Sequence, residues 1–291
     1  MARLKFVSNY QGDEELCERM RRNFLDEESF DPRLQLTAGS DYDALIVFNG
    51  LDREAGVPRE RVFGFLQEPS WSGSYDRDLP ASCGVVFAHA PSAFPAYGNV
   101  RFHPAILPTE VSGEAASFKG DSSFDKPHGL SFVVSALGGG HNYEVRRALV
   151  RRLLASDLDF HLYGRGWQLE DRRYLGPLQD KRDGLAEYRY SIAIENCCER
   201  GYVTEKLFDC FLCNCVPIYL GAPDVAEIYP AGAFLPLDPG ASDLVEHLRG
   251  IASTESTPFR EQVLAAKRRY FAEYNPYLIV RRELLARGEL R

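Results

Sequence analysis

The 291-residue sequence lacks the features that would assign it to a membrane, nucleic-acid-binding or repeat protein. No apolar run approaches the roughly 18 residues that span a bilayer, so we expect no integral membrane segment. The net charge of −8 at pH 7 offers no global attraction to nucleic acid, and we expect no nucleic-acid partner. Because internal repeats and low-complexity tracts are also missing, the composition predicts a globular protein in which a few local cations hold any polyanionic ligand.

The beginning of the sequence, from Met1 to Asn9, has neither a long apolar core nor a small-residue cleavage site. Such a segment is not typical of a secretory signal peptide. We therefore expect a soluble, cytoplasmic protein, and a peripheral position at the inner face of the membrane stays open.

The seven cysteines do not form the pattern of a disulfide framework, because their number is odd and most lie in apolar surroundings. Cys210, Cys213 and Cys215 have a spacing that superficially suggests a metal site. No fourth ligand lies nearby with the usual zinc spacing. We therefore interpret them as small core residues of a helix that runs into a buried strand, and we predict no bound metal.

Short apolar runs alternate with amphipathic stretches along the chain, which favours an α/β architecture with parallel sheets. In the first part the pattern predicts a helix at 13–24 and strands at 4–7, 44–48, 61–66 and 84–88. In the second part it predicts strands at 130–134, 160–163, 191–194 and 216–220. Helices are expected there at 143–155, 185–190 and 204–214, and over most of 259–285.

The composition changes between Pro108 and Lys126, where Ser, Gly, Asp and Lys dominate and apolar periodicity is lost. We interpret this stretch as an interdomain linker. The predicted domains are then 1–115 and 127–270, with a linker at 116–126. A C-terminal helix at 271–291 follows, for which packing back on the first domain is one option. Two such units form a cleft, and ligands of open α/β sheets bind beyond the carboxyl ends of the strands.

The richest candidate segment runs from Glu195 to Lys206, because it follows a predicted strand and opens a predicted helix. Thr204 suits the N-cap position, and Glu205 falls in the first turn, where negative charge is favoured. The backbone N–H groups of such a turn can hold a phosphate, and Lys206 can add a point charge for a diphosphate. The alternative is that Glu205 and Lys206 are ordinary charges at a solvated helix start.

Two further residues are candidates for chemistry. Arg146 lies near a predicted helix start, after the glycine run 138–140, and its guanidinium could bind phosphate oxygens at two points. The alternative is a surface charge on an arginine-rich helix. Glu68 follows a predicted strand of the first domain, where a carboxylate that faces the cleft suits a general base. An N-cap or an ordinary loop acid is the alternative for Glu68.

Three segments in fixed order resemble the signature of the α-1,3-fucosyltransferases of glycosyltransferase family 10. They are Glu195-Asn196, then Tyr202-Val203-Thr204-Glu205-Lys206, then Val216-Pro217-Ile218-Tyr219-Leu220-Gly221. The segments at 9–15, 42–48 and 61–70 are similar in order and spacing to bacterial members of that family. The resemblance is strong over 188–223 and looser over the rest of the chain.

The resemblance implies a GT-B arrangement, in which two Rossmann-like domains face each other. It implies an inverting transfer of fucose from GDP-fucose to a hydroxyl of a glycan acceptor, such as a lipopolysaccharide or another surface glycan. No cofactor is required in this family's fold, and a stimulatory divalent cation stays open. The implied donor-binding residues are Arg146, Asn196, Tyr202, Glu205 and Lys206.

Each of these residues has an implied role. Arg146 and Lys206 would hold the diphosphate, Tyr202 and Glu205 would contact the ribose or the fucose, and Asn196 would line the same pocket. Glu68 would take the proton of the acceptor hydroxyl. These roles agree with the chemistry, because cations at a diphosphate stabilise the charge that grows on the leaving group.

The sequence also departs from the family pattern. Ile194 stands where family members commonly have Phe, and the stretch 70–108 shows the least similarity. The acceptor, the linkage position and the oligomeric state are therefore not predicted. Two alternatives stay open: a GT-B enzyme that uses another GDP-sugar, and an inactive GT-B-like protein that binds carbohydrate.

Overall fold

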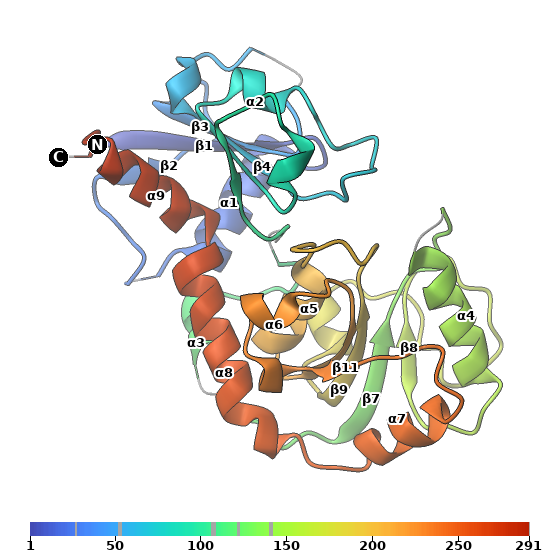
Figure 1. Ribbon diagram of the computed structural model, residues 1–291. Helices are drawn as coiled ribbons and strands as arrows, with labels where there is room; N and C mark the ends of the chain where they lie inside the picture. The colour runs from blue at the N-terminus through green and yellow to red at the C-terminus, as the bar shows by residue number, and fades with distance from the viewer. Residues whose placement is uncertain (27, 52–53, 106–108, 121–122, 140–141, 291) are drawn as a thin grey trace.

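The computed structural model describes residues 1–26, 28–51, 54–105, 109–120, 123–139 and 142–290, and it forms two lobes (Figure 1). Each lobe is built on a parallel sheet. The strand order is β2-β1-β3-β4-β5-β6 in the first sheet and β11-β10-β9-β7-β8 in the second. The predicted α/β class with parallel sheets is confirmed.

The first sheet is the core of the N-terminal lobe, and its central strand β3 is buried at every residue. Long apolar strands flanked by helices are typical of parallel sheets that are covered on both faces. Its strands are β1 (Ala2–Ser8), β2 (Leu34–Leu36), β3 (Ala44–Phe48), β4 (Val62–Leu66), β5 (Val85–Ala88) and β6 (Val100–Phe102). Its helices are α1 (Asp13–Phe24) and α2 (Leu79–Ser82), with 3₁₀ turns η1 (Arg59–Arg61) and η2 (Pro91–Ala93).

The second sheet organises the C-terminal lobe in the same way. Its strands are β7 (His128–Val133), β8 (His161–Tyr163), β9 (Tyr188–Ile194), β10 (Val216–Leu220) and β11 (Leu235–Pro236). Its helices are α4 (Asn142–Leu154), α5 (Glu205–Leu212), α6 (Val225–Ile228) and α7 (Leu244–Ala252). The short turns are η3 (Lys181–Gly184), η4 (Ala231–Ala233) and η5 (Thr257–Phe259).

The end of the chain returns to the N-terminal lobe. Helix α8 (Arg260–Arg269) runs along the C-terminal lobe, and after the π-helical turn η6 (Tyr270–Tyr274) helix α9 (Pro276–Ala286) lies beside the first sheet (Figure 1). The Asn275 side chain caps α9 and donates to the backbone oxygen of Phe24 at 3.1 Å. Arg281 pairs with the buried carboxylate of Asp31 at 2.8 Å. These contacts join the two lobes at a second point besides the chain between them.

The predicted helix at 185–190 is wrong. The structure ends the turn η3 at Gly184 and begins strand β9 at Tyr188. Tyr188 and Tyr190 are buried, whereas the intervening Arg189 is partly exposed, which is the two-residue period of a strand. Pairing with β7 extends this strand beyond the apolar run from which we predicted it.

The segment that we interpret as a linker contains a short helix, α3 (Ala115–Lys119). We did not predict this helix, because the segment lacks apolar periodicity. Ala115 and Phe118 are buried, and Lys267 of α8 donates to the backbone oxygen of Phe118 at 3.1 Å. Residues 108 and 121–122 of this stretch, and the third glycine of the run 138–140, lie outside the described residues.

None of the helices in the described part of the chain is long and apolar enough to cross a bilayer. The cysteines at 210, 213 and 215 are buried where α5 leads into β10, as small core residues.

Candidate active site

A cavity of about 550 Å³ opens at the carboxyl ends of β7, β8 and β9. Its walls come from these strand ends and from the beginnings of α4 and α5. This is the position at which open α/β sheets bind ligands. Its described lining includes four of the predicted site residues: Arg146, Asn196, Glu205 and Lys206.

Arg146 is held rigidly inside this cavity. Its side chain lies near the start of α4, is 6% exposed, and donates through Nε to the backbone oxygen of Ile194 at 3.0 Å. Its Nη2 donates to Oδ1 of Asn196 at 2.8 Å. Within the described residues these bonds use Nε and Nη2, which leaves Nη1 for a ligand. Burial lowers the pKa of the guanidinium, although arginine keeps its charge in proteins.

Asn196 connects Arg146 to Tyr202. Its Oδ1 accepts from Arg146, and its amide nitrogen donates to the Tyr202 hydroxyl at 3.4 Å. Tyr202 is almost fully buried, and burial beside Glu195 and Glu205 raises the pKa of its phenol far above the ordinary value. The phenol is therefore a neutral hydrogen-bonding group that lies outside the described lining of the cavity.

The turn before α5 is built around a buried carboxylate. Glu195 is fully buried and accepts from the backbone nitrogen of Thr204 at 2.8 Å and from its hydroxyl at 2.7 Å. The Thr204 side chain caps the helix by accepting from the backbone nitrogen of Lys206, as the sequence predicts. Glu195 thus holds the first residue of the helix cap in place, which gives this glutamate at the end of β9 a structural role.

Lys206 and Glu205, in the first turn of α5, form an ion pair. The Lys206 Nζ lies 3.1 Å from Glu205 Oε1 and 3.9 Å from Glu195 Oε2. Burial disfavours the ammonium ion, but these carboxylates outweigh it and raise the pKa of Lys206. Burial likewise disfavours ionised Glu205, but Lys206 and Lys181 outweigh it and lower the pKa of Glu205. Both side chains are therefore charged at neutral pH, and Glu205 Oε2 keeps no hydrogen-bond partner among the described residues.

Sequence reasoning missed two further cations in the lining of the cavity, Arg165 after β8 and Lys181 on the turn η3. The Lys181 Nζ lies 2.9 Å from Asp209 Oδ2, 3.5 Å from Glu110 Oε2 and 3.9 Å from Glu205 Oε1. A signal was available in α5, where Glu205 and Asp209 are four residues apart and both are buried. Two acids on one buried face require a buried cation, although the sequence does not say which one.

A glycine of the cavity wall was also missed. Gly164 follows β8 with a φ of +143°, and a Cβ there would lie 1.8 Å from the backbone oxygen of Val134. Only glycine fits this close approach between two strand ends. In the predicted glycine run, Gly139 has a φ of +139°, and no atom of the described residues lies within 4 Å of its Cβ position.

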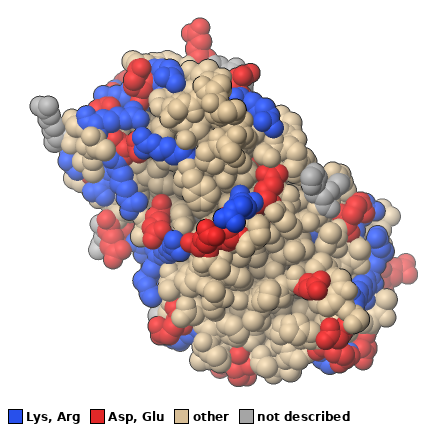
Figure 2. Space-filling model, in the orientation of Figure 1, with Lys and Arg blue, Asp and Glu red and all other residues tan. Residues whose placement is uncertain are grey.

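Glu68 belongs to the other lobe, in the loop after β4, and lies outside the described lining of the cavity. It is half-buried, and burial raises the pKa of its carboxyl, while the charge of Lys206 opposes this and Glu205 adds to it. Glu68 therefore lies within electrostatic reach of the Lys206 turn across the lobe boundary. Figure 2 shows acidic and basic side chains along this boundary and few over the centre of the C-terminal lobe.

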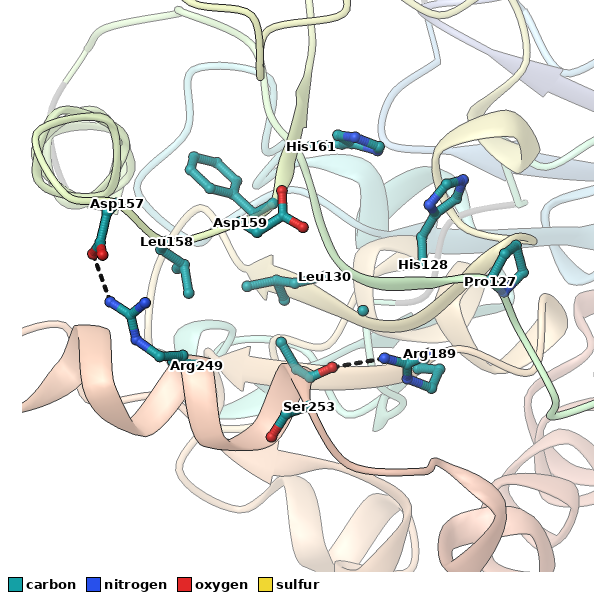
Figure 3. Close-up of a pocket in the computed structure, with 13 residues that line it drawn as sticks. Pro127, His128, Leu130, Asp157, Leu158, Asp159, His161, Arg189, Arg249 and Ser253 are labelled. Atoms are coloured by element: carbon teal, nitrogen blue, oxygen red, sulfur yellow. Dashed lines mark hydrogen bonds and ion pairs between the residues drawn. The ribbon is translucent and has the colours of Figure 1, made fainter.

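The same sheet has a second hollow, of about 470 Å³, at the amino ends of its strands (Figure 3). His128, His161 and Arg189 lie near the beginnings of β7, β8 and β9. Arg189 donates to the backbone oxygens of Lys126 at 3.0 Å and Ala252 at 2.8 Å. Arg249 pairs with Asp157 at 2.6 Å. Both arginines of this hollow therefore already have oxygen partners.

The C-terminal lobe, which carries the first cavity, is similar in sequence to known glycosyltransferases. The sequence model of glycosyltransferase family 10 (fucosyltransferase), C-terminal part, matches residues 125–261. Human α-(1,3)-fucosyltransferase 4 is 30% identical over 168 residues, which cover 53% of this chain and 29% of the relative. The Helicobacter pylori α-(1,3)-fucosyltransferase FucT is 34% identical over 58 residues, which cover 20% of this chain and 12% of the relative. The chain thus spans less than a third of either relative's length.

The fold comparison covers both lobes. A crystal structure of an α1,3-fucosyltransferase with GDP-fucose is similar with a TM-score of 0.54 at 15% identity. The match covers 98% of this chain and 90% of that chain. At this identity the similarity shows the fold alone, and the predicted GT-B arrangement of two Rossmann-like domains is confirmed.

Proposed function

We propose that the chain transfers fucose from GDP-fucose to a hydroxyl group of a glycan acceptor, since residues 125–261 match the sequence model of glycosyltransferase family 10 (fucosyltransferase). The observation that carries this proposal is that Arg146 and Lys206 line one cavity, beyond the strand ends of the lobe that matches the family 10 model. The two cations come from different helices, and the charge of Arg146 reaches Lys206, where it opposes the rise in the pKa that Glu205 and Glu195 cause. A diphosphate is a ligand that such a pair of cations fits.

The donor fits the cavity in three parts. The diphosphate lies between Arg146 Nη1 and Lys206, beside the N-terminus of α5, where helix N–H groups favour negative charge. Glu205 Oε2, a buried oxygen without a described partner, accepts from a hydroxyl of the ribose or the fucose. Asn196 and Tyr202 line the same end of the site. A buried acceptor without a partner gains most when a ligand hydroxyl reaches it.

Glu68 acts as the general base from the opposite lobe. Its carboxylate takes the proton of the acceptor hydroxyl, and the oxygen forms a bond to the anomeric carbon as the bond from that carbon to the β-phosphate oxygen breaks. The electron pair leaves with GDP, whose added charge Arg146 and Lys206 stabilise. Because base and leaving group lie on opposite faces of the sugar, the transfer inverts the anomeric configuration.

Two aromatic side chains of the N-terminal lobe support a sugar as the acceptor. Tyr10 is 45% exposed, and desolvation together with the charges of Glu205 and Glu68 raises the pKa of its phenol, so Tyr10 lies within electrostatic reach of both carboxylates. Trp71 follows Glu68 by three residues and is 41% exposed. Large amphipathic rings beside a base provide apolar faces for a sugar ring. The proposed acceptor is a surface glycan such as lipopolysaccharide. The fucose would be joined to it by an α-1,3 linkage, in the cytoplasm.

The test is product identification by mass spectrometry, with GDP-fucose as donor and a panel of glycan acceptors. A mass increase of one fucosyl group on an acceptor, lost in Glu68→Gln, supports the proposal. Parallel reactions with GDP-mannose and UDP-glucose, each with and without Mg²⁺, test the donor and the stimulation by a cation. Transfer only from another GDP-sugar would replace fucose in the proposal. Binding of GDP without transfer from any donor would favour an inactive, carbohydrate-binding protein.

A further inference from the structure

The turn that leads to Tyr202 is held by the opposite lobe at three points. The backbone nitrogen of Ser70 donates to Glu199 Oε2 at 3.2 Å, and His89 Nε2 lies 2.9 Å from the same oxygen. The backbone nitrogen of Ala105 donates to the backbone oxygen of Gly201 at 3.3 Å. Ser70, His89 and Ala105 follow β4, β5 and β6 respectively, so three successive strand ends of the first sheet contact one turn of the second lobe.

The Glu199 carboxylate is the centre of this contact. Burial disfavours its ionised form, but the hydrogen bonds from His89 and Ser70 outweigh burial and lower the pKa of Glu199. Burial in turn lowers the pKa of His89, so its ring is neutral at neutral pH. Because an ionised carboxylate can only accept, the hydrogen of the neutral ring is assigned to Nε2, which donates to Glu199.

The turn also leaves no room for a side chain at Gly201. Gly201 has a φ of +70°, and a Cβ there would lie 2.7 Å from the Phe102 ring and 3.2 Å from the backbone oxygen of His89. From within its own lobe, Asp224 Oδ1 accepts from the backbone nitrogen of Gly201 at 2.8 Å. The His89 ring also packs edge-on against Tyr202, with 5.3 Å between the ring centroids. The turn therefore has contacts from both lobes.

We infer that Glu199 is a positioning residue, which joins the loop of the general base to the turn of the donor site. This inference rests on the proposed function. Ser70, the residue held by Glu199, is two residues after Glu68, and Pro69 between them restricts the backbone of the loop. Glu199 is three residues before Tyr202, whose backbone nitrogen donates to the Glu199 backbone oxygen at 3.1 Å. One carboxylate thus couples the base and the donor pocket without contacting the substrate.

The motif comparison offers no sign of this role, because Glu199 lies between the two parts of the resemblance, Glu195-Asn196 and Tyr202–Lys206. Its function depends on a contact with Ser70 across 129 positions of the sequence. Only the assembled lobes bring these residues together. The expected consequence is an effect on the rate of transfer rather than on the binding of GDP.

Two variants test the inference in the full chain. Glu199→Ala removes both hydrogen bonds and should lower kcat roughly 10- to 100-fold, because small misplacement of reacting groups has effects of this size. The affinity for GDP, measured by calorimetry, should stay within about twofold, since Arg146 and Lys206 are untouched. Glu199→Gln keeps an acceptor oxygen and should restore most of kcat. Arg200→Ala is the matched control on the same turn, because Arg200 is exposed and pairs only loosely with Asp224 and Glu227 among the described residues.

Hydrogen exchange provides a readout that does not depend on activity. The peptide that contains Ser70 should exchange faster in Glu199→Ala than in the wild type, and Glu199→Gln and Arg200→Ala should resemble the wild type. Unchanged exchange in Glu199→Ala, unchanged kcat, or a loss of GDP affinity equal to the loss of kcat would overturn the inference. A wild-type protein that transfers no fucose would instead overturn the proposed function, and the exchange experiment would still decide whether Glu199 holds the loop of Glu68.

Discussion

The second sheet carries a hollow at each end, and the two hollows differ in what surrounds their cations. At the carboxyl ends, Arg146 and Lys206 lie beside the beginnings of α4 and α5. At the amino ends, Arg189 and Arg249 lie beside the end of α7 and the turn after α4. The same lobe thus has two cavities of similar volume, and only in the first do the named cations lie beside the beginnings of two helices.

The direction of the chain explains this difference. In a parallel sheet every connecting helix starts at the carboxyl ends of the strands, so helix N–H groups gather at one end. At the other end helices finish, and their carbonyl oxygens need donors. Arg189 supplies such donors, since it binds the backbone oxygen of Ala252, the last residue of α7. Arg189 therefore satisfies a helix end at the amino ends of the strands, whereas Arg146 and Lys206 lie beside helix beginnings, where an anion is favoured.

The largest expected effect tests whether the chemistry takes place at the carboxyl-end hollow. Glu68→Gln should reduce turnover by roughly 10²- to 10⁴-fold, the usual share of a general base. Donor affinity should be unchanged, because Glu68 belongs to the other lobe. Steady-state kinetics combined with GDP calorimetry measures both quantities. Full activity in this variant would show that another group takes the proton.

Arg146→Lys should have the next largest effect. Lysine keeps the charge but cannot donate to the Ile194 oxygen and to Asn196 while also reaching the diphosphate. We expect a decrease of roughly 10²-fold in kcat, similar to the loss of one donor to a developing charge. The neighbour Arg147, which pairs with Glu144 at 3.6 Å on the helix surface, is the matched control. Equal kinetics for Arg146→Lys and Arg147→Lys would contradict the proposed role.

Lys206→Ala should weaken GDP binding roughly 10- to 100-fold, since a charge-assisted hydrogen bond contributes about 1.5–3 kcal/mol. Calorimetry with GDP measures this directly. Unchanged affinity would remove Lys206 from the diphosphate site.

The pH dependence of kcat/KM tests whether Glu68 titrates under the influence of Lys206. Burial raises the pKa of Glu68, so kcat/KM should begin to fall, as the pH is lowered, at a higher pH than for an ordinary glutamate. The Lys206 charge holds that pKa down. In Lys206→Ala the acid limb should therefore move to still higher pH, and in Arg249→Ala it should stay in place. An acid limb that does not move in Lys206→Ala would show that Glu68 is not the group that titrates.

The smallest effect is expected at the amino-end hollow. Arg249→Ala breaks an ion pair with Asp157, whose side chain is 85% exposed. Such pairs contribute about 0–1 kcal/mol, so stability should change little and GDP affinity should not change. Thermal melts with and without GDP check both. A loss of the GDP-dependent increase in melting temperature would show that the amino-end hollow binds the nucleotide.

The sequence alone predicted most of the elements that carry the proposed site. Apolar periodicity and helix-capping residues predicted α1, β3 and α5 at or near their observed bounds. Both signals depend only on residues that are close together in the sequence. The family resemblance pointed to Arg146, Asn196, Glu205 and Lys206, which the structure brings to one cavity. Their assigned roles stay predictions. The error at 185–190 arose where pairing with β7, rather than local pattern, decided that Tyr188 and Tyr190 are in a strand.

Only the tertiary structure decided which charges meet across the chain. Lys181 reaches Asp209 and Glu205 through the packing of η3 against α5, and no local pattern encodes that distance. Glu199 reaches Ser70 and His89 only because the two lobes face each other. Local propensity and motif spacing act over a few residues, whereas burial of a charge demands a partner from wherever the fold can supply one. The sequence by itself therefore determined the fold class and the donor-side motif, and the assembled lobes determined how the motif is held.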